Sequence, residues 1–350
     1  MPIASTTGHG SAPGKVILLG EHAVVYGRTA VAVALDRHVR VNIVSAVSCD
    51  EAKTAPRRDC GEGSTWESAP FPVTLFAPIE SEPSPELQRL RKALACAAGY
   101  LRLDPSPLAL SVDTDLPMAV GLGSSAALSV ALVRALAAVA AFELDDTSVC
   151  NAALEVEKLF HGYPSGIDNT VATFGGMLAF KRGQPHRQLN AACALPLVVA
   201  VGRLPRQTQA GVLNLRGRWQ REPDRYEGWF DEIDWLAGTA EGAIANGHLG
   251  KLGGLMNSNH RLLQQLGVST PELDSMVDLA RAHGALGAKL TGGGGGGAVI
   301  CLCPDSRDEL IRAFAAAGWN AFTTDLHPAL RGEHAGNLPA PSRDYRDLRA

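Results

Sequence analysis

A glycine- and serine-rich segment in the middle of the chain has the composition of an anion-binding loop. Residues 117–127 read PMAVGLGSSAA, and the apolar stretch that follows predicts a helix over roughly 126–142. A helix N-terminus exposes unpaired backbone N–H groups and carries about half a positive charge. Glycine lets the backbone approach a ligand, and a serine hydroxyl can bind phosphate or a metal ion. Phosphate is therefore the expected ligand, and a glycine turn for tight helix packing is the alternative.

Two common nucleotide-binding motifs do not account for this segment. Residues 121–126 match G-x-G-x-x-A, but a dinucleotide-binding fold also needs a second strand and an acidic residue about 20 positions later. Here the predicted helix leads to Asp145 and Asp146 and then into another predicted helix. The sequence G-x-x-x-x-G-K-[ST] occurs nowhere in the chain, which excludes a Walker-type phosphate loop.

Two carboxylates lie on either side of a glycine–proline turn further along the chain. Glu157 belongs to the last turn of a helix expected over 145–161, and Asp168 follows the sequence HGYPSGI. This spacing can direct both side chains into one cleft, where one could bind a divalent metal ion and the other could take a hydroxyl proton. The alternative is a capped loop with a solvated glutamate and an aspartate N-cap.

Charged residues also adjoin glycines near the N-terminus. Lys15 opens the apolar strand KVILLG, and Glu21 and His22 follow at its exit. A buried lysine near a carboxylate would keep that carboxylate ionised and favour charge on a transferring group. The alternatives are a solvated lysine at a strand edge and a structural histidine.

The longest glycine run lies near the C-terminus. Six consecutive glycines occupy 292–297, after Lys289 and Thr291, and the whole stretch 285–297 predicts a glycine-rich loop. Such a run suits close approach of the backbone to a ligand. A flexible linker is the alternative, which the apolar strand expected over 298–303 disfavours.

The remaining pattern predicts the elements that must position these segments. Further strands are expected at 31–44, 108–115, 177–181, 197–201 and 321–326, and further helices at 83–100, 227–247, 250–266, 272–284 and 305–318. The polar stretch 183–193 predicts a domain boundary. The alternation of strands and helices after it favours an α+β sandwich. The charged segment 49–68 predicts a loop or an irregular hairpin.

Composition restricts the possible partners and the compartment. A chain of 350 residues with 46% hydrophobic and 19% charged residues is long enough for two packed domains. The formal net charge of −4 gives no reason to expect nucleic acid or an acidic membrane. The apolar run after residue 126 is shorter than the ~20 residues of a membrane span and contains Arg134. Seven cysteines without a C-x-x-C pair, and no signal-peptide pattern, predict a cytoplasmic protein.

Taken in their order along the chain, these segments resemble the three signature motifs of the GHMP small-molecule kinase superfamily. The second motif, P-x-x-x-G-L-G-S-S-A, matches residues 117–126 in full, and residues 20–27 and 161–169 resemble the mevalonate kinase family in particular. The resemblance implies a two-domain α+β fold. An N-terminal ribosomal-protein-S5-like domain would span 1–188, a C-terminal ferredoxin-like α/β sandwich 189–330, and a polar tail 331–350.

The resemblance also implies a role for each matching residue. Asp168 would be the catalytic base for the 5-hydroxyl of (R)-mevalonate, with Lys15 as its charge partner, and Ser125 and Glu157 would bind Mg²⁺. Glu21, His22 and Thr291 would bind substrate. ATP would contact the loop residues Pro117, Gly121, Leu122, Gly123, Ser124, Ser125 and Ala126. The implied activity is ATP-dependent phosphorylation of mevalonate for isoprenoid biosynthesis, carried out by a homodimer.

Two alternatives to this activity remain open. One is a sibling kinase that acts on another small hydroxy acid, such as a mevalonate phosphate. The other is a catalytically silent ligand sensor, which is disfavoured by the presence of Lys15, Ser125, Glu157 and Asp168. The chain departs from the family pattern at Gly293, which takes the place of an alanine, and at Gln209, where a basic residue is frequent. The second departure predicts altered phosphate affinity or specificity.

Overall fold

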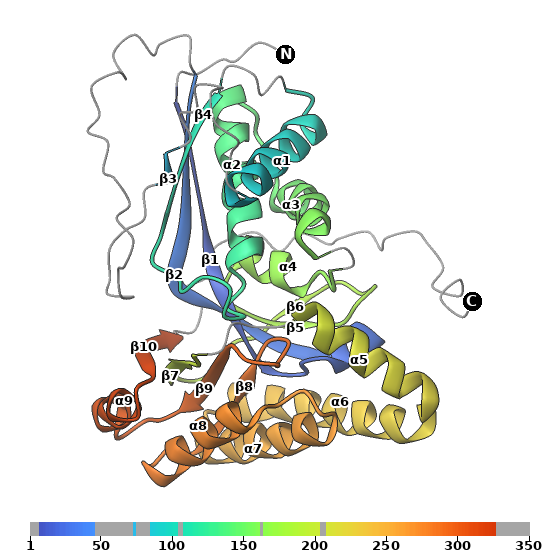
Figure 1. Ribbon diagram of the computed structural model, residues 1–350, viewed down its shortest axis with the longest axis vertical. Helices are drawn as coiled ribbons and strands as arrows, with labels where there is room; N and C mark the ends of the chain where they lie inside the picture. The colour runs from blue at the N-terminus through green and yellow to red at the C-terminus, as the bar shows by residue number, and fades with distance from the viewer. Residues whose placement is uncertain are drawn as a thin grey trace.

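Two antiparallel sheets organise the protein (Figure 1). The computed structural model describes residues 7–45, 73–74, 85–103, 108–161, 164–203 and 208–326. The strands of the first sheet are β1 (Thr7–Leu19), β2 (Ala30–Ser45), β3 (Val73–Thr74), β4 (Leu108–Thr114), β5 (Met177–Phe180) and β6 (Arg187–Gln188). The strands of the second are β7 (Leu195–Val201), β8 (Gly287–Thr291), β9 (Ala298–Leu302) and β10 (Asn320–Leu326). Because the described sheets separate between 188 and 195, we retain 1–188 and 189–330 as the proposed domains.

The long strand β2 forms the spine of the first sheet. The order is β3-β4-β2-β5-β6, and β1 pairs with β2 along most of its length. One end of β2 pairs with β4 through residues 39–45, and the other end pairs with β5 through residues 30–33. The β1–β2 ladder shifts register between Pro13 and Lys15 and again between Ile17 and Leu19. The three residues that include Lys15 thus lie between two irregularities.

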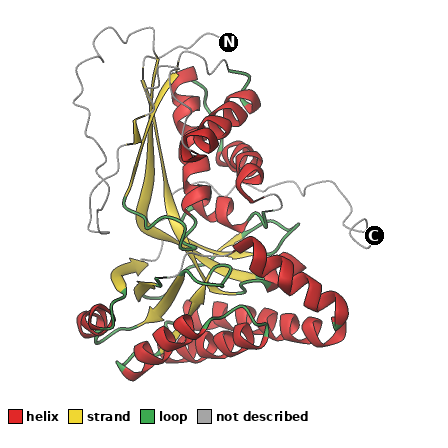
Figure 2. Cartoon of the chain, viewed as in Figure 1, coloured by secondary structure: helices red, strands yellow, loops and turns green. Residues whose placement is uncertain are grey.

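Helices cover one face of the first sheet (Figure 2). They are α1 (Pro85–Tyr100), α2 (Ser124–Ala140), α3 (Asp146–His161) and α4 (Ile167–Phe174). Helix α2 packs directly on β1 because β1 carries glycines there: a Cβ on Gly10 would lie 2.6 Å from the backbone nitrogen of Ala135. Arg134 of α2 bonds the carbonyls of Ser11 and Thr173, which joins the helix to β1 and α4. Since α3 follows α2 with no strand between them, the expected departure from a dinucleotide-binding fold is confirmed.

The second sheet has the order β10-β7-β9-β8, which is the strand order of a ferredoxin-like α/β sandwich. Its helices are α5 (Thr208–Arg221), α6 (Pro223–Ala245), α7 (Leu249–Gln265), α8 (Pro271–Ala282) and α9 (Arg307–Ala316). The first four connect β7 to β8, and α9 connects β9 to β10. The α+β fold class is therefore confirmed.

Two elements of the second domain differ from the sequence-based expectation. The stretch 285–297 is not a loop throughout, because Gly287–Thr291 forms β8, which is fully buried and pairs with β9. Its glycine and lysine give little strand signal, so tertiary pairing decides its structure. Helix α5 is likewise not expected from the sequence, since its interior contains Gly211 and Gly217 and many polar residues.

Three predicted features fall wholly or partly outside the described residues. They are the segment 49–68, the tail 331–350 and Gln207 of the unusual Gln-Thr-Gln sequence. Gln209 belongs to α5, but its side chain is not described. In the described part of the chain, none of the helices combines the length and apolar character that a membrane span requires.

Candidate active site

Backbone contacts between β1 and the glycine loop build the floor of the candidate site. The backbone N–H of Lys15 donates to the carbonyl of Leu122 at 2.8 Å, and the Lys15 ammonium lies 3.4 Å from the carbonyl of Gly121. Gly123, the N-cap of α2, has a φ of 75°, and a Cβ there would lie 2.8 Å from Cγ of Lys15. Glycine is needed at 123 because both the backbone conformation and the packed lysine exclude a side chain.

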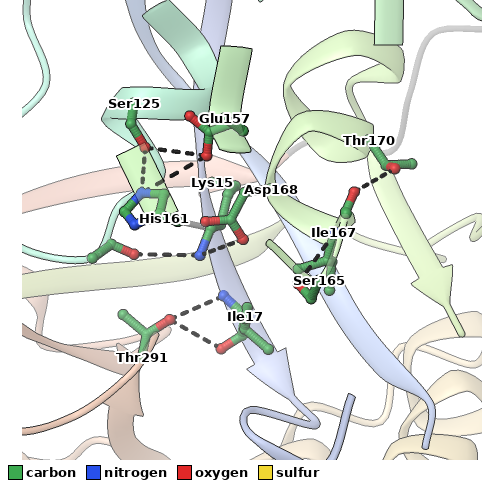
Figure 3. A network of polar contacts seen from close by, with 12 residues as sticks. Lys15, Ile17, Ser125, Glu157, His161, Ser165, Ile167, Asp168, Thr170 and Thr291 are labelled. Carbon is green, nitrogen blue, oxygen red and sulfur yellow. Dashed lines mark hydrogen bonds and ion pairs between the residues drawn. The ribbon is translucent and has the colours of Figure 1, made fainter. Parts of the chain in front are cut away.

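The buried lysine meets an aspartate from another element. Lys15 Nζ lies 3.1 Å from Oδ1 of Asp168, and the side chains are 2% and 30% exposed respectively. Figure 3 shows the ammonium between Asp168 and the glycine loop. Asp168 sits in the first turn of α4, which begins after Gly166 at a φ of 92°. The structure therefore excludes a solvated edge lysine and brings a fixed cation against a half-exposed carboxylate.

The first turn of α2 meets the end of α3 beside this pair. Ser125 Oγ donates to Oε2 of Glu157 at 3.3 Å and lies 3.0 Å from Nε2 of His161 (Figure 3). Ser129, one turn after Ser125, donates to Oε1 of Glu157 at 3.2 Å. Burial, aided by the negative charge of Asp168, raises the pKa of Glu157 to about 8. A cation at Ser125 would favour the ionised form of this carboxyl group.

Glu21 is a buried carboxylate that meets polar side chains of the second domain. Its side chain is buried, and Lys289 of β8 donates to Oε1. Asn259 of α7 donates to Oε2 at 3.1 Å, so protein donors engage both carboxylate oxygens. The structure therefore places Glu21 at the contact between the two domains.

Thr291 and His22 also occupy defined positions. Thr291 Oγ1 accepts from the N–H of Ile17 at 2.9 Å and lies 3.3 Å from the carbonyl of the same residue, so the hydroxyl faces β1 (Figure 3).

His22 precedes the short 3-10 helix η1 (Ala23–Tyr26), with φ 61° and ψ −50°. This conformation costs a non-glycine residue on the order of 1–3 kcal/mol, and such strain is frequent at functional sites.

The structure thus gathers part of the predicted set into one constellation: Lys15, Asp168, Ser125, Glu157 and the loop 121–126. Glu21 and Thr291 instead join the domains. Sequence reasoning assigned no role to Ser129 or His161, which both contact this constellation. The available signal was helical spacing, because Ser129 follows Ser125 by four residues and His161 follows Glu157 by four.

This constellation has the parts that phosphoryl transfer requires. Such reactions depend on positioning and charge stabilisation rather than on covalent chemistry by the protein. A loop at a helix N-terminus can receive phosphate, the lysine can stabilise negative charge, and the aspartate can take a hydroxyl proton. Among the described residues, no group of three or more His, Cys, Asp or Glu could hold a metal ion. The fold and the site define a small-molecule kinase.

Comparisons with known proteins identify the family. The model of the GHMP kinases N-terminal domain matches residues 88–176, and the model of the GHMP kinases C-terminal region matches 240–320. The mevalonate kinase of Methanothermobacter thermautotrophicus is 34% identical over 316 residues, covering 90% of this chain and 96% of the relative. That of Thermococcus onnurineus is 31% identical, covering 90% and 95%. The crystal structure of L. major mevalonate kinase in complex with R-mevalonate superposes with a TM-score of 0.77 at 28% identity, covering 94% and 99%. The chain belongs to the mevalonate kinase family of GHMP kinases.

Proposed function

We propose that this protein transfers the γ-phosphoryl group of ATP to the 5-hydroxyl of (R)-mevalonate. The observation that carries the proposal is the contact of 3.1 Å between Lys15 and Asp168 beside the glycine loop. The family identification supports the substrate. In the proposed assignment, residues 117–126 bind the phosphates of ATP and Asp168 accepts the proton of the hydroxyl group.

The reaction asks little covalent chemistry of the protein. An alcohol is a weak acid, so Asp168 receives its proton late, as the bond to phosphorus forms, rather than generating a free alkoxide. Lys15 is held by the carbonyls of Leu122 and Gly121, so its charge is already oriented when the substrates bind. A preoriented charge needs no reorganisation in the transition state, which is the main source of its catalytic effect.

We further propose Mg²⁺ as the metal and Ser125 and Glu157 as its protein ligands. Mg²⁺ prefers oxygen ligands and is usually bound by one or two protein groups plus waters and substrate phosphates, which fits a hydroxyl beside a carboxylate 3.3 Å away. The raised pKa of Glu157, about 8, also fits a carboxyl group whose charge a cation compensates. When bound, the ion would neutralise charge on the phosphates.

A substrate panel tests the proposed reaction. The protein is assayed for ADP release with mevalonate, phosphomevalonate and other small hydroxy acids, and the phosphorylated product is identified by mass spectrometry. We expect turnover with mevalonate above that with every other acceptor. Preference for phosphomevalonate would contradict the proposal and favour the sibling kinase. ATP binding without turnover of any acceptor would favour the silent sensor.

The role of Asp168 is tested with D168N. We expect turnover to fall by about 10³-fold or more, while nucleotide affinity stays close to that of the wild type, because the amide cannot accept the hydroxyl proton. D113N is the matched control, since Asp113 is a half-exposed aspartate on β4 that pairs with Arg40 at the sheet surface. Wild-type turnover in D168N would refute the assignment.

Two properties of the family are carried over as proposals. We infer a homodimer and a cytoplasmic location. Sedimentation equilibrium over a concentration series tests the first, and a monomer at every concentration would contradict it. Cell fractionation with an antibody to the protein tests the second.

A further inference from the structure

Two buried charges have no role in the chemistry described above. Lys289 lies in the middle of β8, in the second domain, and Glu21 follows β1, in the first. The exposed fraction of both side chains in this ion pair is 0%. Removing charges from water is energetically costly, and apolar residues often replace a buried ion pair without loss of stability. A pair of this kind is therefore weak evidence for stability and invites a search for another role.

Further hydrogen bonds occupy the polar atoms of the Glu21–Lys289 pair. Lys289 Nζ donates to Glu21 and to the carbonyl of Leu290 at 2.7 Å, while Asn259 occupies the second carboxylate oxygen of Glu21. Burial raises the pKa of Glu21 and lowers the pKa of Lys289, and the opposite charge of each partner acts against the shift of the other. The carboxylate thus has its partners within the protein and needs none from a substrate.

The same short segment of β8 also holds the strand that carries Lys15. Thr291, two residues after Lys289, bonds both the N–H and the carbonyl of Ile17, two residues after Lys15. Lys289 Nζ itself lies 3.5 Å from the Ile17 carbonyl. In the β1–β2 ladder, register shifts flank the segment from Lys15 to Ile17. Contacts from the second domain therefore supplement a strand that its own sheet holds irregularly.

We propose that Glu21 and Lys289 are positioning residues, which join β8 to β1 so that Lys15 is held in register with Asp168. The inference rests on the proposed function. It replaces the expectation that Glu21 and Thr291 contact the substrate: they act through the strand that bears Lys15. The glycine run 292–297 follows β8 directly, so the contact between β8 and β1 also fixes the position at which this run begins.

The test measures kcat, the KM for mevalonate and the affinity for a fluorescent ATP analogue in E21Q, K289M and the double variant E21Q/K289M. R187Q is the matched control, because Arg187 pairs with Glu241 across the same two domains at 2.8 Å but at the surface. A melting curve is recorded for each protein. Should K289M fail to fold, the double variant and T291V continue the test, since neither leaves a buried charge unpaired.

We expect E21Q and K289M each to lower kcat about tenfold or more, with the KM for mevalonate and the nucleotide affinity within about threefold of wild type, because misplacement of a reacting group affects the chemical step. The double variant should be no slower than the slower single variant, and R187Q should match the wild type. A tenfold rise in the KM of E21Q without a matching change in K289M would overturn the inference in favour of direct substrate contact. Wild-type kcat in both variants would also overturn it. A wild type inactive on mevalonate would instead refute the proposed function.

Discussion

Replacing Gly123 with alanine tests whether the glycine loop and Lys15 form one packed unit. Gly123 has a φ of 75°, a conformation that costs an L-residue about 1–2 kcal/mol. The new Cβ would also lie 2.8 Å from Cγ and 3.2 Å from Cε of Lys15. Lys15 is only 2% exposed, so its side chain cannot swing into solvent to relieve the contact.

The size of the effect follows from what Lys15 touches. Restoring an ordinary carbon–carbon contact of about 3.8 Å from 2.8 Å moves the side chain by about 1 Å. Its ammonium lies 3.1 Å from Asp168 and 3.4 Å from the Gly121 carbonyl, so such a displacement weakens both contacts. A misplacement of about 1 Å can reduce turnover about 10²-fold, which corresponds to about 2.7 kcal/mol in the barrier. We therefore expect G123A to lose about 10²-fold in kcat and about 1–2 kcal/mol in stability.

Steady-state kinetics and urea unfolding separate the two contributions. G183A is the matched control: Gly183 has a φ of 78°, and a Cβ there meets nothing within 4 Å. It should lose similar stability but keep its kcat. A kcat of G123A within about threefold of wild type would refute the packing argument. So would a loss confined to nucleotide affinity, which would mean that the added methyl group obstructs phosphate rather than moving Lys15.

Three further predictions concern the support of the site and of the fold. S129A should raise the Mg²⁺ concentration for half-maximal activity about tenfold, as read from a Mg²⁺ titration, because it removes a hydrogen bond to Glu157. Burial lowers the pKa of His260 to about 4. As the pH falls below about 6.5, His260 therefore binds a proton in the unfolded chain but not in the folded protein, which destabilises the wild type. H260Q lacks this effect, so between pH 7 and pH 5 its free energy of unfolding should fall by about 2 kcal/mol less than that of the wild type. G10A should lose about 3 kcal/mol or more, since its methyl group meets the backbone of α2, whereas G228A, on an open face of α6, should gain about 0.5–1 kcal/mol in urea unfolding.

Each of these has a contrary outcome. An unchanged Mg²⁺ dependence in S129A would remove Ser129 from the support of Glu157. Parallel losses of stability in wild type and H260Q on acidification would mean that His260 titrates alike in both states. A soluble, fully stable G10A would show that β1 and α2 can separate at no cost.

Most helices and strands could be predicted because their signals are local. The apolar run before Phe142 and the alternation in residues 39–44 follow the periods of a helix and a strand, which depend on residues a few positions apart. Strand β8 could not be predicted, since Gly287, Lys289 and Thr291 adopt it through pairing with β9 and burial. Helix α5 contains two glycines, so its own propensity is weak.

The candidate site also has features that the sequence predicted and contacts that only the fold shows. Residues 117–126 indicate a phosphate loop by themselves, because a glycine-rich turn at a helix start creates the site within one stretch of chain. The spacing of Glu157 and Asp168 also indicated that both side chains could point into one cleft. Their contacts required the fold, which brings Lys15 against Asp168 from a strand more than a hundred residues earlier.

The sequence by itself predicted an anion-binding loop and determined the family resemblance and most of the secondary structure, since all three depend on residue types at short spacing. Only the tertiary structure decided which charges meet. It paired Glu21 with Lys289, and it directed Thr291 to the backbone of Ile17. The physical reason is that burial and pairing partners are set by the docking of two domains, whose contacting residues lie far apart in the chain.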